Sequence, residues 1–116
     1  MGNLCKMSEE EKKERNLPLI DNYYSFKENE EVLGFVKVNY LENPDIYIFI
    51  FEDKRGFGYG NALFLKVMQN MKEHGINSFE IEFSLENLIM ARVANKNGGI
   101  EYTRKDNVVK YIIPIL

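Results

Sequence analysis

The stretch E-D-K-R-G-F-G-Y-G-N-A-L, residues 52–63, is the feature that most restricts how this chain can fold. Its three glycines alternate with aromatic residues, directly after the most β-prone run of the sequence, IYIFIF at 46–51. Glycine inside or next to a regular element costs folding free energy, so this arrangement needs a physical reason. The stretch is either a tight strand-to-helix turn, or a loop whose N–H groups bind an anion at the start of a helix.

The spacing of the glycines excludes the two commonest phosphate-binding loops. A P-loop requires G-x-x-x-x-G-K-[ST], but counting from Gly56 the sixth position is Asn61 and the lysine is missing. A dinucleotide fingerprint requires G-x-G-x-x-G, and its sixth position falls on Asn61 from Gly56 or on Leu63 from Gly58. The pattern that remains is R-x-x-G-x-G, from Arg55 to Gly60.

Hydrophobic periodicity places the loop in the order β-β-β-loop-α-β-α-β-β, after a short charged helix over 8–16. The first strands are predicted over 23–27, 32–41 and 46–51, and the continuously apolar third one is expected to be buried on both faces. A helix follows from Asn61 and ends at Gly75. The alternating segment 78–83 predicts a strand, 87–97 a helix with Leu88 and Val93 inward, and 100–104 with 108–113 a hairpin.

Composition and charge restrict the class of protein. With 116 residues, the sequence predicts a single domain over 1–116, with a short N-terminal helix and linker at 1–22 and a core at 23–116. The net charge of -3 offers no general attraction to nucleic acid or anionic lipid. The single Cys5 and single His74 provide neither a disulfide framework nor a structural zinc site. Because apolar runs of membrane-span or signal-peptide type are missing, we expect a cytoplasmic protein without membrane or nucleic-acid partners.

The R-x-x-G-x-G pattern, between a buried strand and a helix, resembles the acetyl-CoA loop of the GCN5-related N-acetyltransferase (GNAT) family, [QR]-x-x-G-x-[GA]. The segment N-L-I-M-A-R-V-A-N-K-N-G-G-I at 87–100 resembles the family's later motif, and NKNGGIEY resembles a bacterial branch of small predicted acetyltransferases. The likeness extends from about Val32 to the C-terminus. It implies an α+β fold of three layers (α/β/α), with a mixed, mostly antiparallel sheet in which two parallel strands splay apart, and with an abbreviated N-terminal part.

The resemblance implies acetyl-CoA as co-substrate and no metal. Carried over by position, backbone groups of Ile48, Phe49 and Ile50 would pair with the pantetheine arm, and Asn87 would contact the cofactor. Arg55 would add a positive charge. The N–H groups that would hold the pyrophosphate belong to Gly56, Phe57, Gly58, Tyr59, Gly60 and Asn61. For the aromatic rings of Phe57 and Tyr59, packing of the loop onto the helix is the alternative role.

The resemblance is less complete for the catalytic groups. Glu82 matches a position where some relatives carry the general base, although its alternative role is an exposed carboxylate on the polar face of a strand. Ala94 stands where many relatives have the tyrosine that protonates the leaving thiolate. Water, Tyr102 or Tyr111 would then have to replace that tyrosine.

The function implied by the resemblance is an N-acetyltransferase. It would move an acetyl group from acetyl-CoA to a primary amine of a small molecule or peptide, by direct attack in a ternary complex. The alternatives are a non-catalytic acyl-CoA-binding regulatory module and a structural or dimerising domain. Relatives usually carry a strand and two helices before the strands recognised here, whereas only a short helix and a linker precede Tyr23. This short N-terminal part has three possible explanations: a homodimer partner completes the pocket, the acceptor is a large exposed amine, or activity has been lost.

Overall fold

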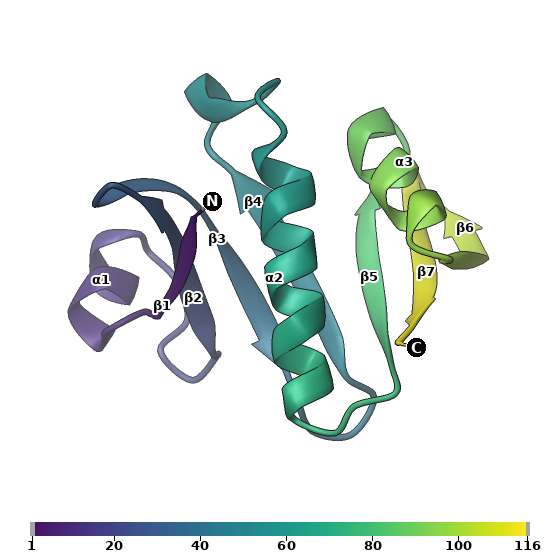
Figure 1. The fold of residues 1–116 in the computed structure, drawn as a ribbon, viewed down its shortest axis with the longest axis horizontal. Helices are drawn as coiled ribbons and strands as arrows, with labels where there is room; N and C mark the ends of the chain where they lie inside the picture. Colours follow the sequence, from purple (N-terminus) through teal and green to yellow (C-terminus); the bar gives the residue numbers. More distant parts are fainter. Residues whose placement is uncertain (1, 116) are drawn as a thin grey trace.

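A computed structural model describes residues 2–115, which form one seven-stranded sheet and three α-helices (Figure 1). The order of strands across the sheet is β1-β2-β3-β4-β5-β7-β6. Within this part of the chain, no helix is both long enough and apolar enough to span a membrane. The elements, in chain order, are β1 (Asn3–Lys6), α1 (Glu9–Glu14), β2 (Tyr23–Glu28), β3 (Glu31–Asn39), β4 (Asp45–Ile50), the short 3₁₀ helix η1 (Glu52–Lys54), α2 (Tyr59–Glu73), β5 (Ser78–Ser84), α3 (Leu88–Lys96), β6 (Ile100–Lys105) and β7 (Val108–Pro114).

The two central strands, β4 and β5, form the parallel pair of the sheet, and the other neighbouring strands are antiparallel. Their pairing is short, because it consists of Asp45 opposite Glu80 and Ile46 opposite Ile81. Beyond these residues the strands diverge, as Figure 1 shows on either side of α2. The predicted α+β class, with its mixed sheet and splayed parallel strands, is therefore confirmed.

The hydrophobic core lies between one face of the sheet and the helices α2 and α3. Alternation along the strands brings apolar side chains of β2 to β5 and β7 to this face, where they meet the buried stripe of α2. The core includes Phe26, Val36, Ile46, Phe64, Val67, Phe79, Ile81, Val93 and Ile113. On the opposite face α1 packs on β2, where the Ser25 hydroxyl donates a hydrogen bond to the Glu11 carboxylate at 2.6 Å. Helices thus lie on both faces, which gives the predicted three layers.

Two predictions about burial were wrong. The strand β4 is not buried on both faces, because its Tyr47 side chain is 46% exposed on the face that α1 leaves open. Leu88 is exposed, whereas the buried residues of α3 are Met90, Val93 and Ala94. The helix begins at Leu88, with Asn87 as its N-cap, so the inward stripe at i, i+3 and i+4 starts at Met90.

The N-terminal part contains a strand that the sequence pattern did not reveal. The strand β1 pairs antiparallel with β2, with Leu4 opposite Phe26 and Cys5 opposite Ser25. Cys5 therefore lies in the sheet and not in a frayed end. Of the strand and two helices that relatives usually place here, this chain has a strand and one short helix before Tyr23. The abbreviation concerns the helices of the N-terminal part.

Candidate functional site

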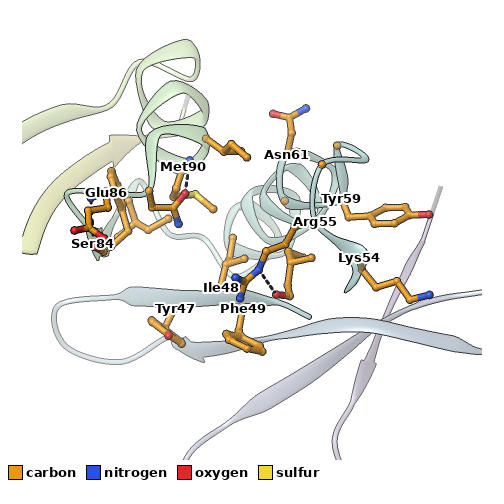
Figure 2. A pocket seen from close by; sticks show the side chains of 18 of the residues that line it. Tyr47, Ile48, Phe49, Lys54, Arg55, Tyr59, Asn61, Ser84, Glu86 and Met90 are labelled. Carbon is orange, nitrogen blue, oxygen red and sulfur yellow. Dashed lines mark hydrogen bonds between the residues drawn. The ribbon is translucent and has the colours of Figure 1, made fainter. Parts of the chain in front are cut away.

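A cleft of about 630 Å³ opens where β4 and β5 diverge. The residues of one wall come from β4, the glycine loop and the first turn of α2, and those of the other from β5 and the start of α3 (Figure 2). The predicted site residues that line this cleft are Ile48, Phe49, Ile50, Arg55, Gly56, Gly58, Tyr59, Gly60, Asn61, Glu82 and Asn87. The structure therefore brings together residues from distant parts of the sequence that were predicted to share one site.

The glycine loop presents backbone N–H groups to one end of the cleft. Gly56 and Gly58 have φ angles of 87° and 82°, which lie in the left-handed region that glycine adopts without strain. Gly58 is the N-cap of α2, and no side chain caps this helix. Within residues 2–115, the N–H groups from Gly56 to Asn61 have no hydrogen-bond acceptor. Unpaired N–H groups at the positive end of a helix dipole form a site for an anion such as a phosphate.

Arg55 joins this loop to β4. Its Nε donates a hydrogen bond to the Ile50 carbonyl oxygen at 2.9 Å, and its guanidinium carbon lies 5.4 Å from the centre of the Phe49 ring (Figure 2). The neighbouring Lys54 forms an ion pair with Glu31 at 2.8 Å, and this hydrogen bond raises the pKa of the Lys54 ammonium. The Arg55 side chain thus holds the loop against the strand and brings a positive charge to the cleft wall.

The edge of β4 provides a second set of backbone groups. The Phe51 N–H donates to the Leu33 carbonyl of β3, so in this antiparallel pair the odd-numbered residues of β4 face β3. The backbone groups of Ile48 and Ile50 then face β5, with which no residue of β4 after Ile46 pairs in the described part of the chain. Phe49 lines the cleft, but by this alternation its backbone groups pair with β3. The Ile50 carbonyl oxygen accepts the hydrogen bond from Arg55, so the groups left for a ligand are the Ile48 N–H and carbonyl and the Ile50 N–H. These groups can bind an extended ligand as a further strand would.

Asn87 and Glu82 lie on the opposite wall. The Asn87 Oδ1 accepts a hydrogen bond from the Met90 N–H at 3.0 Å, which makes Asn87 the N-cap of α3 as well as a lining residue of the cleft. Glu82 is exposed on β5, and it also lines a smaller cavity of about 90 Å³. The neighbouring carboxylate of Glu80 is 3.8 Å from the Lys110 ammonium. Glu82 is therefore a carboxylate at the narrow end of the cleft, where the two parallel strands begin to separate.

Several residues considered from the sequence do not line the cleft. Phe57 is exposed on the loop, with its ring centre 6.0 Å from that of Tyr59. Ala94 is fully buried, and Tyr111 is buried against Phe83 at 5.4 Å between ring centres. Tyr102 lies on β6, where partial burial and the neighbouring Glu80 raise the pKa of its hydroxyl to about 12. Neither tyrosine proposed as a replacement for the missing acid reaches the cleft.

Other residues of the cleft were not predicted as site residues: Tyr47, Lys54, Ile81, Phe83, Ser84, Glu86, Ile89 and Met90. Tyr47 was not predicted as a site residue, because its strand was wrongly expected to be buried on both faces. Ser84 ends the second parallel strand and Glu86 follows it, and polar residues at the carboxyl end of such a strand are a signal that could have located them. Among residues 2–115, no three His, Cys, Asp or Glu side chains lie close enough together to hold a metal ion.

Comparison with protein families gives one match that covers most of the chain. Residues 4–99 match the model of the Acetyltransferase (GNAT) family. Among curated proteins, none matches the chain in sequence closely enough to count as a relative.

Solved structures with the same fold share little sequence with this chain. A spermidine N-acetyltransferase from Vibrio cholerae, in a dodecameric structure, has a TM-score of 0.77 at 11% identity, and the match covers 97% of this chain and 93% of that one. The ribosomal-protein-S18-alanine N-acetyltransferase from Escherichia coli has a TM-score of 0.75 at 13% identity, with 99% and 94% covered. The N-acetyltransferase PseH from Campylobacter jejuni, in complex with acetyl coenzyme A, has a TM-score of 0.69 at 10% identity, with 88% and 73% covered. These likenesses show the fold.

Proposed function

The chain belongs to the GNAT family of acetyl-CoA-dependent N-acetyltransferases, and from this premise we propose that it transfers an acetyl group from acetyl-CoA to a primary amine. The transfer is direct, with donor and acceptor bound together. The observation that carries the proposal is the run of unpaired N–H groups from Gly56 to Asn61, at one end of a cleft whose other end lies between two separating strands.

The residues of the cleft suit acetyl-CoA in shape and chemistry. The N–H groups of the glycine loop and the α2 dipole would bind the negatively charged pyrophosphate. A Cβ placed on Gly56 or Gly58 would meet no atom of the protein within 4 Å, so the space beside these glycines is open to a ligand. Backbone groups of Ile48 and Ile50 would bind the amide-containing pantetheine arm, with Asn87 opposite.

Acetyl-CoA supplies the activated thioester, and the chain has to orient and polarise it. The chain also has to remove a proton from the ammonium group of the acceptor and deliver one to the thiolate. A strand N–H of β4 beside the thioester carbonyl would stabilise the negative charge that develops on its oxygen. Glu82 at the narrow end of the cleft would accept the proton of an incoming ammonium group, as a general base. Its position on the exposed face of β5 keeps the carboxylate accessible to an acceptor.

The class of acceptor is proposed from chemistry shared among the structural neighbours. Their names cite spermidine and the alanine of ribosomal protein S18, which offer primary amino groups on very different scaffolds. We therefore keep the primary amine as the common element. Because one neighbour is dodecameric and α1 is short, a second copy of this chain is the proposed partner for completing the acceptor side.

A second function, an acyl-CoA-binding module without catalysis, is favoured by one observation. Ala94 is fully buried, and it occupies the position where the resemblance to the family leads one to expect a tyrosine acid. In this case the cleft would bind acetyl-CoA, but no amine would accelerate the release of the thiol.

Thiol release in the presence of an amine panel distinguishes the two functions. The panel contains spermidine, a peptide with N-terminal alanine and a lysine-containing peptide, each with saturating acetyl-CoA. The proposal predicts amine-dependent release of free CoA with at least one of them, and acetylation of that amine by mass spectrometry. Binding of acetyl-CoA without any amine-dependent release would favour the second function.

A further inference from the structure

The cleft and the smaller cavity meet at two side chains. The 630 Å³ cleft and the 90 Å³ cavity share Tyr47 and Glu82 among their lining residues. The other residues of the small cavity, Lys37, Asp45, Ile46 and Glu80, do not line the cleft. Tyr47 and Glu82 therefore stand at the passage between the two spaces.

The sheet register explains why these two side chains lie on the same face of the sheet. Ile46 and Ile81 are the last paired residues of the parallel strands, and both are buried in the core. Tyr47 and Glu82 each come one residue later, so alternation turns both side chains to the opposite face of the sheet. On this face α1 packs on β2, and Tyr47 remains half exposed. The narrow end of the cleft thus opens towards the uncovered face between a phenol and a carboxylate.

We infer that the acceptor amine enters from this open face between Tyr47 and Glu82, and that Tyr47 is the proton donor to the CoA sulfur. The inference rests on the proposed acetyl transfer and adds the route of the acceptor and the identity of the acid. Tyr47 would act as the general acid, which Ala94 cannot do because its side chain carries no hydroxyl group. Tyr102 and Tyr111 do not take this role, because neither lines the cleft or the small cavity.

The protons balance in the following way. The ammonium group first loses a proton to Glu82, which passes it to solvent. The amine nitrogen then bonds to the carbonyl carbon, and the carbon–sulfur bond breaks with its electron pair on sulfur. The sulfur takes the hydroxyl proton of Tyr47, and Tyr47 regains a proton from the nitrogen as this becomes an amide. The products are the acetylated amine, the CoA thiol and one proton released to solvent.

The chain offers a matched control for Tyr47. Tyr102 is also on the open face, its exposure of 48% is close to the 46% of Tyr47, and it lines neither space. The variant Tyr47→Phe removes a hydroxyl and keeps the ring. It should lower kcat for amine-dependent thiol release by about 10²-fold, with the Kd for acetyl-CoA unchanged. The variant Tyr102→Phe should keep both constants within about twofold. Equal kcat values for the wild type and Tyr47→Phe would overturn the assignment of the acid.

A binding experiment tests the acceptor route independently of turnover. The probe is CoA whose sulfur is joined through an acetyl group to butylamine, and its affinity is compared with that of CoA by calorimetry. The wild-type chain should bind the conjugate at least about tenfold more tightly than CoA, because the butyl group lies in the small cavity. In Tyr47→Trp this gain should disappear while CoA still binds, and in Tyr102→Trp it should persist.

The outcomes separate the two levels of the proposal. If the conjugate binds the wild-type chain no more tightly than CoA, or if Tyr47→Trp keeps the gain, the acceptor route is wrong while the acetyl-CoA site stands. If CoA itself does not bind, the proposed function is wrong and the inference falls with it.

Discussion

Gly60 differs from the other glycines of the loop because a side chain at this position would cause no backbone strain. Its φ is negative, it belongs to the first turn of α2, and a Cβ placed on it would meet the Ile50 Cγ1 at 4.0 Å. The position nevertheless lines the cleft. The family pattern accepts alanine as well as glycine here, so a larger side chain is needed to test whether a ligand approaches the loop at this position.

The variant Gly60→Glu should stabilise the fold and weaken the binding of acetyl-CoA. Glutamate is a better helix residue than glycine, so the free energy of unfolding should rise by up to about 1 kcal/mol. The added side chain occupies space beside the loop N–H groups and its carboxylate repels the pyrophosphate, so the Kd for acetyl-CoA should rise about tenfold or more. Chemical denaturation and calorimetry measure the two effects. Lys66→Ala, on the exposed side of α2, is the control that should leave the Kd unchanged. An unchanged Kd in Gly60→Glu would contradict the role proposed for the loop.

Asn87 combines a structural contact with a proposed contact to the cofactor, and two substitutions separate them. Aspartate can cap a helix as asparagine does, so Asn87→Asp should retain the stability of the fold. It loses the amide donor and adds a negative charge, so its affinity for acetyl-CoA should fall several-fold. Asn87→Ala should lose about 1 kcal/mol of stability as well as affinity. If Asn87→Asp bound acetyl-CoA like the wild type, Asn87 would be a helix cap alone.

At the scale of elements, the contact between α1 and β2 is expected to depend on pH. The Glu11 carboxylate accepts hydrogen bonds from the Ser25 hydroxyl at 2.6 Å and from the Arg15 Nε at 3.2 Å. Burial alone would raise the pKa of Glu11, but these two hydrogen bonds and the Arg15 charge together lower it. A carboxyl group whose pKa is lower in the folded state stabilises the fold above its unfolded pKa. This stabilisation is lost as the pH falls through the folded value.

The variant Glu11→Gln should therefore be destabilised in a pH-dependent manner. Near pH 7 the free energy of unfolding should be lower than in the wild type by about 1–2 kcal/mol, because a charge-assisted hydrogen bond is replaced by a neutral one. As the pH falls from 7 towards 3, the wild-type carboxyl group takes up a proton, so the difference should shrink. Denaturation at both pH values measures it. A difference that is equal at pH 7 and pH 3 would show that the Glu11 charge does not stabilise this contact.

The elements that could be predicted are those whose pattern is set by local physics. The strict alternation of 78–84 identified β5, and the 3.6-residue period from Leu63 to Met71 identified α2. The strand β1 could not be recognised, because Leu4 is only partly buried against the core and the four residues are held by pairing with β2. The exposure of Tyr47 also depends on tertiary structure, since it follows from the absence of a helix over that part of the sheet.

The same distinction applies to the candidate site. The loop from Arg55 to Asn61 was recognisable because its glycine spacing is a local pattern that resembles the acetyl-CoA loop of the GNAT family. Tyr47 was not, since its place beside Glu82 depends on the register of two strands separated by a helix in the sequence. Long-range register is fixed by the packing of the core, and a local pattern does not contain it.

At the scale of the whole molecule, the sheet consists of two parts joined at its centre by a short parallel contact. One part contains β1 to β4 and the other β5 to β7, and the contact between them consists of two residue pairs. α2 and α3 also connect the parts through the core. A ligand in the cleft would touch both parts, so acetyl-CoA should stabilise the molecule as a whole. At a concentration of about 100 times Kd, the expected gain in unfolding free energy is about 2.7 kcal/mol.

Titration of the chain with acetyl-CoA in a calorimeter tests the central claim most directly. We predict saturable heat with one molecule of acetyl-CoA per chain, together with a Tm that rises with ligand concentration. In the variant Gly60→Glu the same titration should give a weaker Kd from a protein that is at least as stable. Absence of both heat and thermal stabilisation at millimolar acetyl-CoA would contradict the claim that the cleft between β4 and β5 binds the acetyl donor.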